Sequence, residues 1–81
     1  MRLTFVVNGE PVSLEARSNE ILQDAVFEVL GKSKNLSRKL NEWELRYENG
    51  VLISDWLKPV GAYGFFADAC LYLTLPVGHD G

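Results

Sequence analysis

Residues 18–31, SNEILQDAVFEVLG, predict an α-helix, and this helix limits the fold to a few classes. Their apolar side chains recur at the spacing of an α-helix and share one stripe, which comprises Ile21, Leu22, Ala25, Val26, Val29 and Leu30. Ser18 and Asn19 are both good N-caps, and Gly31 suits a helix C-cap, so we expect the helix to begin at residue 18 or 19 and to end at Gly31. A single helix with one apolar stripe can cover one face of a sheet.

The residues before the helix predict a β-hairpin. Apolar and polar side chains alternate over residues 2–7 and again over residues 12–17, on either side of Asn8-Gly9. Asn-Gly favours a tight reversal because both residues tolerate a positive φ. Pro11 suggests a slightly longer or bulged connection, so the register next to the turn stays open.

The residues after the helix predict two further strand regions joined by a long crossover. Apolar and charged side chains alternate over residues 42–48, and Asn49-Gly50 then reverses the chain into a short strand at residues 51–53. The irregular segment 54–68 carries enough apolar residues to cover an open side of the core, and we expect its Phe65-Phe66 pair to be buried. A last strand is expected over residues 69–75, before Pro76.

This order of elements predicts an α+β domain of the ββαββ type, with a short crossover element before the last strand. The most economical arrangement is the β-grasp roll, in which one sheet wraps around the helix and the last strand lies parallel to the first, between the two hairpins. We expect a domain over residues 1–76 and a flexible tail over residues 77–81. The expected core comprises Leu3, Phe5, Val7, Val12, Leu14, Ile21, Val26, Val29, Leu30, Leu45, Leu52, Trp56, Leu71 and Leu73.

Composition excludes several classes of function. The 81 residues suffice for one domain, 47% of them are hydrophobic, and the net charge of −3 argues against nucleic-acid binding. The chain holds one cysteine, Cys70, and one histidine, His79, too few ligands for a structural zinc. We find no catalytic motif and expect no enzymatic activity, cofactor or metal. The apolar segment 3–7 is too short for the apolar part of a signal peptide, so we expect a cytoplasmic protein. Asp68 interrupts the apolar stretch 59–78, so we expect no membrane span.

Nearly the whole chain resembles a ubiquitin-like protein. The resemblance rests on the opening strand from Met1, the helix stripe from Ile21, the tight hairpin LRYENG at residues 45–50, the turn SDWL at residues 54–57, and LYLTL at residues 71–75 before a short tail. More narrowly, the chain is similar to small bacterial ubiquitin-like proteins encoded beside activating, conjugating and deubiquitinase-like enzymes.

The resemblance implies a monomeric protein modifier. An E1-like enzyme would activate the carboxylate of Gly81, an E2-like enzyme would carry it to a lysine of a target protein, and a deubiquitinase-like peptidase would reverse the attachment. Gly78 would act as a flexible joint, and Pro76 would free the tail from strand pairing. The chain departs from the family's pair of adjacent terminal glycines, because Asp80 precedes Gly81. Two alternatives remain: a non-covalent β-grasp adaptor or small subunit of a larger complex, and a sulfur carrier with a C-terminal thiocarboxylate.

The resemblance also points to a binding face on the sheet. Arg46 and Thr74 stand where ubiquitin-type modifiers present an apolar patch, so we expect standard ubiquitin receptors to bind poorly. Together with Arg2 and the aromatic anchor Tyr72, these residues form a candidate surface for dedicated partners. The alternative is an ordinary solvated sheet face.

Two further features have a functional and a structural interpretation. Cys70 could be a nucleophile, but a packed or half-covered strand cysteine fits better because a catalytic thiol needs a nearby base. Four cations lie close together, Lys32, Lys34, Arg38 and Lys39. They form either a docking patch for an acidic partner or a solvated helix end and loop.

Overall fold

Alternating side chains on either side of Asn8-Gly9 produce the first hairpin. Strands β1 (Arg2–Val7) and β2 (Glu10–Glu15) pair antiparallel in an unbroken register, from Arg2 opposite Glu15 to Val7 opposite Glu10. Asn8 and Gly9 have φ values of 50° and 88°, as a two-residue reversal of this kind requires. The longer or bulged connection suggested by Pro11 is wrong, because Pro11 pairs within the register opposite Val6. A proline is tolerated there because β2 is an edge strand.

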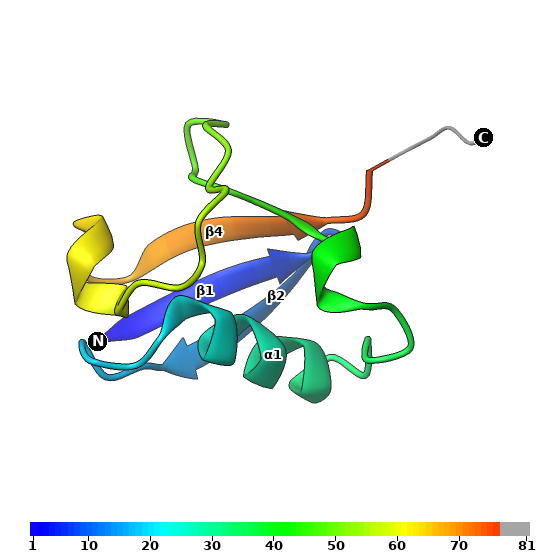
Figure 1. Cartoon of the computed structure of the whole chain (residues 1–81), viewed down its shortest axis with the longest axis horizontal. Coiled ribbons are helices and arrows are strands. Elements are labelled where there is room, and N and C mark those ends of the chain that lie inside the picture. Colours follow the sequence, from blue (N-terminus) through cyan, green and yellow to red (C-terminus); the bar gives the residue numbers. More distant parts are fainter. Residues whose placement is uncertain (77–81) are drawn as a thin grey trace.

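The computed structural model describes residues 1–76, which form one mixed four-stranded sheet with a helix against one face (Figure 1). Strand β3 is Glu44–Arg46 and strand β4 is Ala69–Thr74. The strand order is β2-β1-β4-β3, with β4 parallel to β1 and antiparallel to β3. The expected α+β class is therefore confirmed, and the last strand lies beside the first in the interior of the sheet.

The helix α1 (Leu22–Lys32) begins later than expected. The backbone N–H groups of Leu22 and Gln23 donate to the carbonyl oxygens of Lys58 and Trp56, at 3.0 and 2.8 Å. These two carbonyl oxygens accept the hydrogen bonds that a capping side chain would otherwise accept. Ile21, at the N-cap position, makes no side-chain hydrogen bond to the helix. The predicted N-cap at residue 18 or 19 is therefore wrong, because the crossover segment covers the start of the helix.

The helix also ends later than expected, at Lys32, one residue beyond Gly31. Ser33 is the C-cap, and its Oγ donates to the carbonyl oxygens of Val29 and Leu30 at 3.0 and 3.3 Å. The left-handed residue that follows is Lys34, with a φ of 62°. The chain thus places a lysine where helices usually place glycine or asparagine.

The second hairpin is shorter than its alternation predicts. Only Leu52 forms a ladder bridge to Arg46, while the N–H of Tyr47 donates to the Val51 carbonyl and that of Ile53 to the Leu45 carbonyl. Two 3-10 turns flank this region, η1 (Leu40–Glu42) before β3 and η2 (Val60–Tyr63) in the crossover. No helix within residues 1–76 is long and apolar enough to cross a membrane.

The core lies between the helix stripe and the inner face of the sheet. Of the expected core residues, Leu52 is 46% exposed, and Val12, Ile21 and Trp56 are only partly buried. Ile53 takes the inward position in place of Leu52, because a one-residue change of phase turns each side chain to the other face. The buried residues that the expectation left out are Ala16, Leu22, Ala25, Trp43, Ile53 and Val60.

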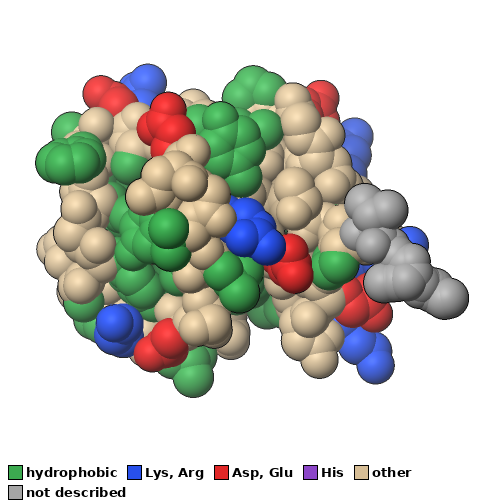
Figure 2. Space-filling model, turned by 90° about the horizontal axis from the view of Figure 1, so that it is seen from above, with side chains coloured by type: hydrophobic (Ala, Val, Ile, Leu, Met, Phe, Trp, Pro, Cys, Tyr) green, Lys and Arg blue, Asp and Glu red, His purple; other side chains and the backbone are tan. Residues whose placement is uncertain are grey.

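Apolar side chains also reach the surface. Phe65 is partly buried against the core, but Phe66 is 84% exposed, so the expected burial of both phenylalanines is wrong for Phe66. Phe65 stacks on Tyr63 with ring centroids 5.3 Å apart, which leaves the neighbouring ring to point outward. In the view of Figure 2, hydrophobic side chains gather at the end of the molecule that carries η2 in Figure 1.

Candidate functional site

The face of the sheet turned away from α1 holds the candidate binding residues. Leu71 and Leu73 of β4 are buried, so the alternating side chains of Cys70, Tyr72 and Thr74 lie on the opposite, outer face. Tyr72 stands at the centre of a cross-strand row, because its two ladder partners are Arg46 on β3 and Val6 on β1. We call this surface the outer face: Arg2, Thr4, Val6, Glu44, Arg46, Cys70, Tyr72 and Thr74.

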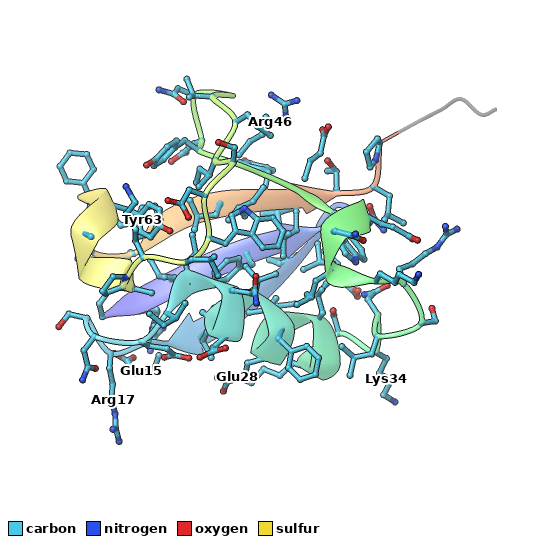
Figure 3. All side chains as sticks on the ribbon, viewed as in Figure 1. Glu15, Arg17, Glu28, Lys34, Arg46 and Tyr63 are labelled. Atoms are coloured by element: carbon cyan, nitrogen blue, oxygen red, sulfur yellow. The ribbon has the colours of Figure 1, made fainter. Side chains whose placement is uncertain are left out.

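The guanidinium of Arg46 is held in place by the second hairpin. Its Nη1 donates to the Gly50 carbonyl at 2.9 Å, and its Nη2 lies 3.2 Å from Oε1 of Glu44. Gly50 has a φ of 91°, which allows the tight turn that presents its carbonyl. Figure 3 shows Arg46 next to this hairpin. The Arg46–Glu44 pair therefore offers a fixed, nearly neutral polar group beside Tyr72.

Tyr72 is exposed enough to act as an anchor for a partner. Its side chain is 37% exposed. The nearby Cys70 raises the pKa of Tyr72, first through its charge and then through a side-chain hydrogen bond, with smaller contributions from desolvation and Glu48. The phenol is thus a neutral hydrogen-bond donor at physiological pH, on an aromatic ring that a partner can cover.

The structure brings together three of the four predicted binding residues. Arg46 is directly opposite Tyr72, and Thr74 is the next outward residue along β4, opposite Glu44. Arg2 lies at the far end of β1, four residues before Val6, which is roughly 13 Å at about 3.3 Å per residue. Arg2 therefore belongs to the same face but not to the Tyr72 row.

The end of β4 positions the base of the tail. The Leu73 carbonyl accepts a bond from the Asn8 N–H at 2.9 Å, and Leu75 packs partly buried against the core. Pro76 is exposed and is the last described residue. The predicted conjugation residues, Gly78 and Gly81, lie outside the described residues.

A groove that the sequence did not reveal lies on the other side of β3. It has a volume of about 670 Å³ and runs between η1 and residues 52–57. Two tryptophans line it: Nε1 of Trp56 donates to the Ile53 carbonyl at 2.7 Å, whereas Nε1 of Trp43 is buried without an acceptor among residues 1–76. Its other lining residues include Leu40, Leu45, Leu52 and Leu57. The signal in the sequence was the pair of tryptophans flanking the second hairpin.

Residues suited to metal or nucleophile chemistry are scattered. Among residues 1–76, no group of three or more His, Cys, Asp or Glu side chains could hold a metal ion. Cys70 is half-buried beside a cavity of about 390 Å³ that Glu48 and Phe66 also line, and this position fits the half-covered strand cysteine. The histidine, His79, lies outside the described residues.

Comparison with known proteins gives two results. A family model described as "Protein of Unknown function (DUF2604)" matches residues 1–81. The chain is 32% identical over 81 residues to a protein called "Uncharacterized protein y4jI" from Sinorhizobium fredii (strain NBRC 101917 / NGR234). That match covers 100% of this chain and 62% of the relative, so the chain spans less than two thirds of the relative's length. The chain therefore belongs to the DUF2604 family.

Proposed function

We propose that this chain is a ubiquitin-like protein modifier with a β-grasp fold, attached to target proteins through Gly81. The course of β4 carries the proposal. This strand lies inside the sheet, parallel to β1, and leads directly into the tail. A tail anchored on an interior strand can be pulled into a catalytic cleft without disturbing the core. Residues 77–81, if fully extended, would reach roughly 17 Å at about 3.3 to 3.6 Å per residue.

The proposed attachment has three steps, each performed by a partner enzyme. The Gly81 carboxylate attacks the α-phosphate of ATP, which forms an acyl adenylate and releases pyrophosphate. A cysteine thiolate of the partner then displaces AMP to give a thioester. Finally, a lysine amine of the target attacks the thioester carbon, which forms an amide, loses one proton and releases the thiol. The requirement for ATP and reduced thiols is consistent with a cytoplasmic location.

The chain's own contribution is recognition and access. Glycine at the reacting position lets a cleft close around the backbone, which a Cβ would obstruct. Tyr72 offers an aromatic anchor on the outer face, with the fixed Arg46–Glu44 pair beside it. An activating enzyme can therefore hold the folded domain through the outer face while it acts on the tail.

The direct test is a search for branched peptides in the native cell. Trypsin is unsuitable, because no Lys or Arg follows Lys58 in the sequence. A protease that cleaves before aspartate would leave Asp80 and Gly81 as a two-residue branch on each modified lysine. The control is a variant that lacks Gly81, expressed at the same level.

The outcomes separate the candidate functions. Asp-Gly branches on target lysines that disappear in the variant lacking Gly81 would support the modifier. An intact mass with one sulfur in place of one oxygen would support the sulfur carrier instead. A single unprocessed and unconjugated species under all growth conditions would exclude covalent use.

A second candidate is the non-covalent adaptor, and the tryptophan-lined groove favours it. A groove of about 670 Å³ has the size of a ligand or peptide site. An adaptor would need neither Gly81 nor ATP. Co-purification of an unmodified partner that is lost on Leu57→Asp, but kept when Gly81 is removed, would favour this function.

A further inference from the structure

The chain carries its positive charge unevenly. Four of its eight Lys and Arg residues lie within residues 32–39, and residues 29–41 contain no Asp or Glu. The rest of the chain then holds four basic and eleven acidic residues, a net charge of −7. Residues 29–41 thus carry a charge of +4, or +3 with Glu42, which pairs with Arg38, and this attracts anionic groups to one end of a molecule with a net charge of −3.

These cations are available to a partner. Lys32, Lys34, Arg38 and Lys39 are all exposed. Among residues 1–76, Arg38 pairs with Glu42 at 3.6 Å, Lys32 donates to the Ser13 carbonyl at 3.3 Å, and Lys34 and Lys39 form no ion pair. Figure 3 shows Lys34 projecting from the loop after α1.

The loop that carries the cations is held by its own hydrogen bonds. The Asn35 side chain donates to the carbonyl and the hydroxyl of Ser33, at 3.0 and 2.9 Å, and the Ser33 hydroxyl is bonded to the last helical turn. Lys34 occupies the left-handed position of this loop, at a φ of 62°. A fixed backbone loses little conformational entropy on binding, so the position of Lys34 in this loop is set before a partner binds.

Apolar side chains lie beside the cations. Leu36 is 50% exposed, and a Cβ added at Gly31 would lie 3.7 Å from its Cδ1, so Leu36 rests against the helix at Gly31. Phe27 is 53% exposed and lies one turn before Gly31 on the same helix face. We call this surface the basic end: Phe27, Gly31, Lys32, Lys34, Leu36, Arg38 and Lys39. It combines positive charge with a shallow apolar strip.

We propose that the basic end docks an acidic segment of a partner protein that also carries aliphatic side chains. The carboxylates would face Lys34 and Lys39, and the aliphatic groups would cover Leu36 and Phe27. A nucleic acid fits less well, because the charge of −7 on the rest of the chain repels a phosphate backbone. The docking site requires no chemistry at Gly81 and is independent of the proposed function.

The test is a titration of the full ¹⁵N-labelled chain with a synthetic peptide in which Glu and Asp alternate with Leu. We expect backbone amide shifts at residues 27–39 and weaker binding as salt rises. Lys34→Glu combined with Lys39→Glu should weaken binding by at least about tenfold, since each exposed ion pair contributes roughly two- to fivefold and reversal adds repulsion. Replacing Leu by Ser in the peptide should also weaken binding.

The matched control is Arg17→Glu, the same type of charge reversal at an exposed site at the opposite end of the molecule in Figure 3. It should leave affinity within about twofold, because the 11 residues of α1, roughly 16 Å at about 1.5 Å per residue, separate Arg17 from Lys34, and this exceeds the screening length of roughly 8 to 10 Å. Absence of saturable shifts at low salt would overturn the proposal, as would equal weakening by Arg17→Glu. Tighter binding of a single-stranded oligonucleotide than of the peptide would also overturn it and would identify the surface as a nucleic-acid site.

Discussion

Replacing Lys34 tests both the local structure and the use of the basic end. The N–H of Lys34 donates to the Gly31 carbonyl at 3.2 Å and that of Asn35 to the Leu30 carbonyl at 2.8 Å, the two bonds of a Schellman motif. The left-handed φ of 62° costs a residue with a Cβ roughly 1 to 2 kcal/mol. Glycine removes this cost, but it also raises the conformational entropy of the unfolded chain, which lowers the free energy of unfolding by about 0.4 to 1 kcal/mol.

We therefore expect Lys34→Gly to be about 0.5 to 1 kcal/mol more stable than Lys34→Ala, or about 2 to 8 °C in Tm for a domain of this size. Both variants lose the same positive charge, so their difference isolates the Cβ. Urea denaturation would measure the free energy of unfolding. An alanine variant that is clearly more stable than the glycine variant would refute the left-handed assignment. Both variants should lose affinity for the acidic peptide equally, because the charge and not the backbone makes that contact.

Three further substitutions probe the core, the hairpin and the outer face. Leu45→Ala should cost about 2 to 5 kcal/mol in urea denaturation because Leu45 is fully buried, whereas Leu52→Ala should cost less than about 1 kcal/mol. Arg46→Ala should destabilise the domain by about 1 kcal/mol and speed amide exchange in the second hairpin, because two hydrogen bonds are lost. Cys70→Ser should lower the pKa of Tyr72 toward its ordinary value of 10.0 in an ultraviolet titration, since Cys70 is the main cause of the rise. Because the pKa of Tyr72 is higher in the folded than in the unfolded chain, the folded chain holds the phenol proton to a higher pH. The contribution of Tyr72 to the free energy of unfolding is therefore complete below pH 10 and declines as the pH rises further.

The elements that the sequence predicted well are those set by local periodicity. Alternation over residues 2–7 reproduced β1, and Asn8-Gly9 gave the expected reversal. The single helix and its apolar stripe led to the α+β class because one helix can cover only one face. The polar residues of β4 likewise identified Tyr72 and Thr74 as outward-facing.

The features that the sequence missed depend on contacts between distant segments. The start of α1 is capped by the Lys58 and Trp56 carbonyls, more than thirty residues away, and no local pattern reports such a contact. Ile53 and not Leu52 points into the core because Leu52 is the residue that pairs with Arg46, and this pairing sets which side chains face inward. The same pairing places Leu52 at the surface, where it lines the groove together with Trp56.

The outer face and the basic end should act at different stages of binding. The basic end lies on the same side of the molecule as the end of β4, because η1 leads into β3 and Glu44 pairs with Thr74 (Figure 1). A partner that approaches the end of β4 therefore passes the exposed lysines, whereas Tyr72 is covered only after contact. Long-range charge changes association rates, and the burial of an aromatic anchor changes dissociation rates. For a partner that contacts both surfaces, Lys34→Glu should slow association and flatten its salt dependence, while Tyr72→Ala should mainly speed dissociation. Stopped-flow measurements of both variants would contradict this division if Lys34→Glu changed only the dissociation rate.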